Sequence, residues 1–134
     1  MKSIKQYLGT LFLISSMLLG QAVSAAEADG HIDGEHFRLY YKSTINPLPL
    51  YRIHGWIIHI DTLEGEPVNG ASVTVYGGMP AHRHGLPTRP RVIETGDGHY
   101  FMQGLKFSMT GEWEVWFDVK AGDKTDKFKI DLTL

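Results

Sequence analysis

The sequence predicts an all-β protein built as an antiparallel sandwich of two sheets, and three observations support this fold class. After residue 25 the apolar residues recur with a period of two, and no stretch has the 3.6-residue period of an amphipathic helix. Turn signals made of Gly, Asn, Asp and Pro separate the alternating segments. About seven short strands spaced in this way over about 100 residues are typical of an immunoglobulin-like sandwich.

The first 25 residues are expected to be a cleaved secretory signal peptide. Lys2 and Lys5 form a positive start, residues 8–19 form an apolar core, and Val23-Ser24-Ala25 supplies the small residues of a cleavage site. The apolar run is too short for a permanent membrane anchor, and the chain has no Cys for lipidation. We therefore expect a periplasmic or secreted protein with no permanent membrane anchor.

Residues 26–36 are expected to form a flexible leader in front of the folded domain. They carry four acidic groups and two His with almost nothing apolar, and chain termini are rarely tied down. The alternative is a weak metal-collecting tail that uses His31 and His36. Composition alone leaves both interpretations open.

The expected strands then follow along residues 37–134, which are predicted to form one domain. Five of them are recognised by the turn signals that separate them, such as Asn46-Pro47, Asn69-Gly70 and Gly96-Asp97-Gly98. In chain order these strands are residues 37–44, 51–61, 71–76, 91–95 and 99–107.

The clearest alternation marks the last two strands, which Ala121-Gly122-Asp123 separates. One side of each is apolar and the other is mostly charged, which indicates one buried and one solvated face. Their apolar residues are Trp113, Val115, Phe117 and Val119 in the first, and Phe128, Ile130, Leu132 and Leu134 in the second.

The charge balance argues against a nucleic-acid partner. Without the expected signal peptide, eleven Lys and Arg stand against fifteen Asp and Glu, a net charge of −4 with His neutral. Nucleic-acid binding needs a basic face instead. Because the chain has no Cys, its stability has to come from a hydrophobic core, and about 100 residues suffice for one such core.

The segment 77–87 concentrates the potential chemistry of the chain, and we call it the Met-His loop. It places the thioether of Met79 and the imidazoles of His82 and His84 within six residues. Thioether and imidazole are ligands that Cu(I) accepts readily, and His99 or Met102 in the following strand is a candidate to complete the set. Zn²⁺ held by the three His with a carboxylate or water remains an alternative.

A structural or partner-contact role for the Met-His loop is the competing interpretation. Met79 is then a core residue, and the loop contacts a protein partner or a small anionic ligand through Arg83, Arg89 and Arg91, since guanidinium groups recognise carboxylates. Trp116 lies on the acidic side of its strand, so it either packs at a rim or belongs to an exposed contact surface.

The second half of the chain resembles the YtkA-like family of small exported bacterial domains, which is related to the FixH-like proteins. Two blocks carry the resemblance: the loop at residues 79–85 and the run from Gly98-His99-Tyr100 to Glu112-Trp113. It covers about residues 68–134. The resemblance implies an immunoglobulin-like sandwich outside the cytoplasm, often in the company of copper-handling or respiratory-oxidase assembly proteins. The chain is expected to differ from the FixH-like proteins in having no permanent transmembrane anchor, because its apolar N-terminal run is short.

These observations predict a non-enzymatic protein. The sequence has no His-Glu-x-x-His motif, no Gly-x-Ser-x-Gly elbow, no phosphate-binding glycine loop and no Cys nucleophile, so no catalytic residue is expected. The first hypothesis is a periplasmic protein that binds or delivers copper through Met79, His82 and His84 with His99 or Met102. The alternative is a metal-free interaction module that binds a protein partner or a small anionic ligand.

Overall fold

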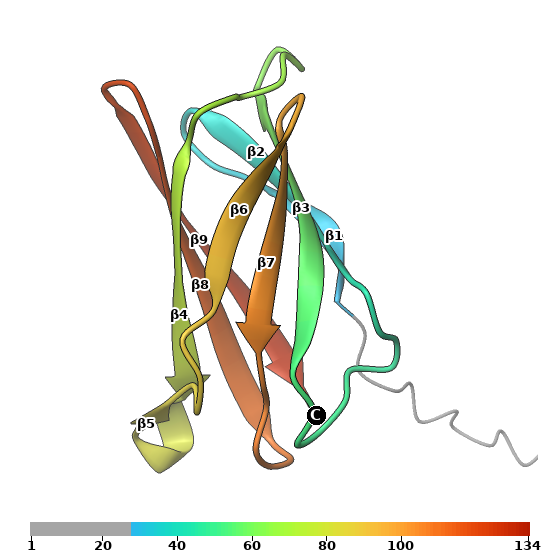
Figure 1. Ribbon diagram of the computed structural model, residues 1–134. Coiled ribbons are helices and arrows are strands. Elements are labelled where there is room, and N and C mark those ends of the chain that lie inside the picture. The colour runs from blue at the N-terminus through green and yellow to red at the C-terminus, as the bar shows by residue number, and fades with distance from the viewer. Residues whose placement is uncertain (1–27) are drawn as a thin grey trace, which may run out of the picture.

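The computed structural model describes residues 28–134, and the expected signal peptide lies outside these residues. The described chain is a sandwich of two antiparallel sheets (Figure 1). One sheet has the strand order β1-β2-β3-β7-β6 and the other the order β5-β4-β8-β9. The elements of residues 28–134 are β1 (Asp29–Asp33), β2 (Phe37–Ser43), β3 (His54–Thr62), β4 (Ser72–Met79), the 3-10 turn η1 (Pro80–His82), β5 (His84–Gly85), β6 (Arg91–Gly96), β7 (His99–Leu105), β8 (Glu112–Ala121) and β9 (Lys124–Thr133).

The predicted fold class is confirmed, and the alternation of side chains explains how the core forms. Each strand turns every second side chain toward the opposite sheet. Thus Trp56 of β3 and Phe117 of β8 lie fully buried with their ring centroids 6.3 Å apart. The charged alternates of β8 and β9 face solvent, as expected. Among residues 28–134, no helix has the length and apolar character needed to cross a membrane.

The structure corrects the expectation of a flexible leader at residues 26–36, because part of this segment forms strand β1. Residues Asp29–Asp33 pair with β2 along their whole length. Ile32 packs against the core, and Asp29 and Asp33 form ion pairs with Lys42 and Arg38 of β2. The acidic residues that suggested a mobile segment therefore lie at a sheet edge, where charge is common because it discourages edge-to-edge pairing.

The Met-His loop contributes the second unexpected strand, the two-residue β5. Met79 and His84 pair across a tight hairpin that η1 closes. This hairpin lies at one end of the sandwich, whereas the turn between β6 and β7, from which His99 begins, lies at the other end (Figure 1). His99 is thus separated from the Met-His loop by about the length of the domain.

Candidate functional site

A pocket of about 270 Å³ lies on the outer face of the four-stranded sheet, beside the Met-His hairpin. It brings together four of the residues singled out from the sequence: Met79, Arg83, His84 and Trp116. The rest of its lining comes from β4, the start of η1 and β8, namely Tyr76, Gly77, Gly78, Pro80 and Glu114. We call this the Arg83 pocket.

Two glycines shape the floor of the Arg83 pocket by letting backbones approach closely. A Cβ on Gly77 would lie 2.1 Å from the carbonyl oxygen of Glu114, and a Cβ on Gly78 would lie 2.2 Å from the carbonyl oxygen of His84. No side chain can occupy such positions without a shift of the backbone. The glycines therefore allow β4 to lie against β8 and β5 where the hairpin turns.

The η1 turn positions Arg83 at the pocket. Arg83 adopts a left-handed conformation with φ 54°, and its backbone N–H donates to the carbonyl of Pro80 at 3.3 Å. The guanidinium forms no ion pair with any carboxylate of residues 28–134. An exposed guanidinium with five N–H donors is a ready receptor for a carboxylate from outside the chain.

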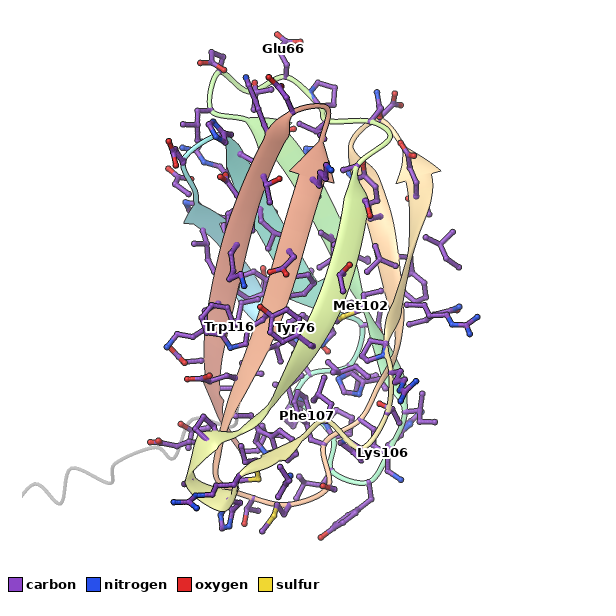
Figure 2. The ribbon with its side chains drawn as sticks, turned by 90° about the vertical axis from the view of Figure 1, so that its left-hand side faces the viewer. Glu66, Tyr76, Met102, Lys106, Phe107 and Trp116 are labelled. Atoms are coloured by element: carbon purple, nitrogen blue, oxygen red, sulfur yellow. The ribbon has the colours of Figure 1, made fainter. Side chains whose placement is uncertain are left out.

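Tyr76 and Trp116, which also line the pocket, form a stacked pair on neighbouring strands (Figure 2). They are cross-strand partners of β4 and β8, and their ring planes are 3° apart with centroids 6.2 Å from each other. The Tyr76 hydroxyl donates to Asp118 at 3.2 Å, and the Trp116 indole N–H donates to Glu114 at 3.1 Å. With their polar atoms engaged on β8, the two rings offer chiefly apolar surface to a ligand.

Two lysines of β9 balance the carboxylates around this aromatic pair. Lys127 Nζ lies 5.7 Å from the Tyr76 ring centre, and Lys129 Nζ lies 5.8 Å from the Trp116 ring centre. The hydrogen bond with Tyr76 raises the pKa of Lys127, and the hydrogen bond with Asp131 raises the pKa of Lys129. Both lysines therefore carry a positive charge at neutral pH, which leaves the acidic groups of β8 compensated.

The metal site expected from the sequence, Met79, His82 and His84 with His99 or Met102, is not assembled. Met79 is only 1% exposed and Met102 is fully buried, so both thioethers belong to the core. His99 lies at the far end of the domain. Among the described residues no group of three or more His, Cys, Asp or Glu side chains is arranged to hold a metal ion.

His82 and His84 are the two members of the expected set that remain neighbours at the surface. Their ring centroids are 5.9 Å apart. The Nδ1 of His84 lies 3.2 Å from the carbonyl oxygen of Gly85, and its ring packs edge-on against the buried Trp113. His84 is thereby held in place by the core, while His82 stands exposed on η1.

The other two arginines do not reach the Arg83 pocket. Arg89 lines a separate hollow between β4 and the loop that leads to β6, and Arg91 is exposed on β6 in the other sheet. Sequence reasoning missed Tyr76 and Glu114. Both lie on outward-facing positions of alternating strands, but their approach depends on the β4–β8 register, which no local pattern encodes.

Comparison with known proteins confirms the predicted resemblance. Residues 53–118 match the model of the YtkA-like family. The crystal structure of a DUF4426 family protein from Pseudomonas aeruginosa PAO1 superimposes with a TM-score of 0.59 at 13% identity, covering 80% of this chain and 94% of that chain. At this identity the likeness concerns the fold. The search of curated proteins gives no match.

Proposed function

We propose that this chain, YtkA-like over residues 53–118, is an exported, non-enzymatic interaction module that binds a carboxylate-bearing segment of a partner protein in the Arg83 pocket. One observation carries the proposal: the same pocket is lined by the guanidinium of Arg83, which has no ion-pair partner among residues 28–134, and by the stacked rings of Tyr76 and Trp116. Aromatic and Arg side chains are enriched where protein surfaces bind each other most tightly.

The chemistry of the pocket favours a carboxylate beside an apolar group. Arg83 supplies paired N–H donors for the carboxylate, and the rings supply contact area that loses little side-chain entropy on binding. Glu114 also lines the pocket, but it accepts the indole N–H of Trp116 and pairs with Lys129 at 3.5 Å. The charge of Glu114 is therefore compensated within the sheet. The positive charge of Arg83 is not, so the pocket favours a negatively charged ligand.

The direct test is an array of short extended peptides that carry Asp or Glu next to an aromatic or aliphatic residue, each beside its Asn or Gln counterpart. Binding is followed by the tryptophan fluorescence of the protein. We expect the carboxylate peptides to bind and their amide counterparts to bind at least about tenfold more weakly, as one charge-assisted pair contributes about 1.5–3 kcal/mol.

Two variants and a matched control locate the binding site. Arg83→Ala and Trp116→Ala are each expected to weaken binding, whereas Arg91→Ala removes an exposed arginine outside the pocket and leaves binding unchanged. Equal affinity for carboxylate and amide peptides, no binding of any peptide, or full binding by Arg83→Ala would each overturn the proposal.

Copper binding is the second candidate function, and the His82–His84 pair favours it. With metal–nitrogen distances of about 2.0 Å, two imidazoles on one trigonal ion have ring centroids roughly 5.5 Å apart, close to the 5.9 Å between these rings. Protons compete for the same nitrogens, so binding is expected to weaken as the pH falls. A copper-handling or respiratory-oxidase assembly protein is then the proposed recipient of the ion.

Calorimetric titration of the protein with Cu(I), which is held reduced and buffered by a competing chelator, tests this second function. Binding in a 1:1 ratio that is lost in the His82→Ala, His84→Ala double variant would support it. Absence of binding by the folded wild type, or unchanged binding by the double variant, would exclude the Met-His loop as a copper site.

A further inference from the structure

A row of aromatic and imidazole rings crosses the outer face of the five-stranded sheet, at the end of the domain away from the Met-His loop. His31, Tyr40, His59 and His99 are successive cross-strand partners on β1, β2, β3 and β7. Neighbouring ring centroids are 5.5, 5.6 and 4.2 Å apart along the row. The shortest of these spacings joins the two imidazoles of His59 and His99.

Each imidazole of this pair has one ring nitrogen already engaged. The Nε2 of His59 lies 2.7 Å from Asp61 Oδ1 in an ion-pair contact, and the Nδ1–H of His99 donates to the carbonyl of Asp97 at 3.0 Å. In a neutral imidazole such an acceptor fixes the tautomer and leaves a lone pair on the other nitrogen, which is Nδ1 in His59 and Nε2 in His99. Metal-binding histidines are held by the same kind of second partner.

The free nitrogen of His59 is buried without a hydrogen-bond partner. Unsatisfied buried polar atoms are uncommon in folded proteins and point to a missing ligand or to a functional role. The neighbouring His99 is exposed, so its ring can adjust to admit a ligand. A lone pair that nothing in residues 28–134 satisfies therefore lies beside a second imidazole that is open to solvent.

The spacing of the two rings fits coordination of one ion. With metal–nitrogen distances of about 2.0–2.1 Å, two imidazoles bound at a right angle have centroids roughly 4.5 Å apart, against 4.2 Å here. Right-angle pairs of nitrogens occur in the square-planar sites that Cu²⁺ and Ni²⁺ prefer. No thioether is part of this pair, so the donors suit divalent ions better than Cu(I).

We propose that His59 and His99 bind one divalent transition-metal ion of the Cu²⁺, Ni²⁺ and Zn²⁺ group, with water in the remaining positions. Asp61 acts as a positioning residue that orients the His59 ring. Two protein ligands make an open site rather than a closed structural one. This site is independent of the Arg83 pocket and of the His82–His84 pair, which lie at the other end of the sandwich.

The test is calorimetric titration of the full chain with CuCl₂, NiCl₂ and ZnCl₂ in turn, with electron paramagnetic resonance of the Cu²⁺ complex. We expect 1:1 binding and a spectrum with two nitrogen donors. His99→Ala removes an exposed ring and is expected to abolish this binding without loss of folding, checked by circular dichroism. Asp61→Ala is expected to weaken binding about 10- to 100-fold, the usual effect of losing such a second partner.

The His82→Ala, His84→Ala double variant and His31→Ala are matched controls that keep His59 and His99. Both are expected to retain the binding of the wild type. The proposal is overturned if the wild type binds none of the three ions, if His99→Ala binds as the wild type does, or if binding is lost in either control instead.

Discussion

Asp126 Oδ2 accepts the backbone N–H of Phe37 at 2.8 Å, and this hydrogen bond links β9 of one sheet to the start of β2 in the other. The same oxygen accepts the N–H of His36, also at 2.8 Å. Asp126 is 6% exposed, and a Cβ on Gly34 would lie 2.3 Å from its oxygen. The turn between β1 and β2 is therefore built around one buried carboxylate.

Replacement of Asp126 by Ala is expected to lower the free energy of unfolding by about 2–3 kcal/mol. One buried and one partly buried backbone N–H group would lose their acceptor, and an unsatisfied buried donor costs about 1–3 kcal/mol. Urea denaturation of the variant measures the loss. Asp123→Ala, in the exposed β8–β9 turn, is the matched control and is expected to stay within about 0.5 kcal/mol of the wild type; equal stability of the two variants would contradict this role.

The seven expected strands were predictable because each has a local pattern of apolar and polar residues or turn signals at its ends. Phe128, Ile130 and Leu132 alternate with polar residues, and all three are buried. Strand β1 was not predictable in this way, because its acidic residues gain their stability from Lys42 and Arg38 of the neighbouring strand. A short edge strand depends on its partner more than on its own composition.

The candidate site was predictable in its residue types but not in its grouping. Met79 is close to His82 and His84 in the sequence. Because side chains alternate along β4, however, the thioether of Met79 points into the core of the sandwich. The separation of His99 from the loop follows from the path of the chain between the sheets. The approach of Tyr76 to Trp116, and of His59 to His99, depends on strand register, which tertiary packing decides.

Met79 is expected to behave as a core residue in a stability measurement. Met79→Ala should lower the free energy of unfolding by about 2–5 kcal/mol, because it leaves a cavity. Met79→Leu conserves volume and should cost less than about 1.5 kcal/mol. The same two variants titrated with Cu(I) separate packing from ligation: if Met79→Leu folds well and loses copper that the wild type binds, the thioether is a ligand and its assignment to the core is incomplete.

The hairpin that carries Arg83 is expected to fail when Gly78 gains a side chain. In Gly78→Ala the new Cβ would meet the carbonyl oxygen of His84 at 2.2 Å, whereas in Gly85→Ala the nearest atom lies 3.3 Å away. Gly78→Ala should therefore be destabilised by about 1–3 kcal/mol through a backbone shift, and Gly85→Ala by clearly less. Thermal unfolding ranks the two variants, and the reverse order would show that β5 does not lie against Gly78.

The buried His54 is expected to make stability depend on pH in the weakly acidic range. Burial lowers the pKa of His54 from its usual 6.5, although a hydrogen bond to the carbonyl of Arg52 acts in the opposite direction. The unfolded chain therefore binds the proton first as the pH falls, and the contribution of neutral His54 to stability is lost as the pH falls from about 7 toward the folded pKa.

The corresponding measurement is the free energy of unfolding at several pH values between about 7.5 and 5.5, compared between the wild type and two variants that do not titrate at this position. In His54→Leu and His54→Phe the decline toward acidic pH should be shallower than in the wild type, because the extra proton uptake of the unfolded state has been removed. Agreement between the two variants separates the lost titration from any change in packing beside Phe107, which lies 5.7 Å from the His54 ring. If both variants lose stability as steeply as the wild type does, protonation of His54 is not the cause of the acid sensitivity, and other groups that titrate in this range must account for it.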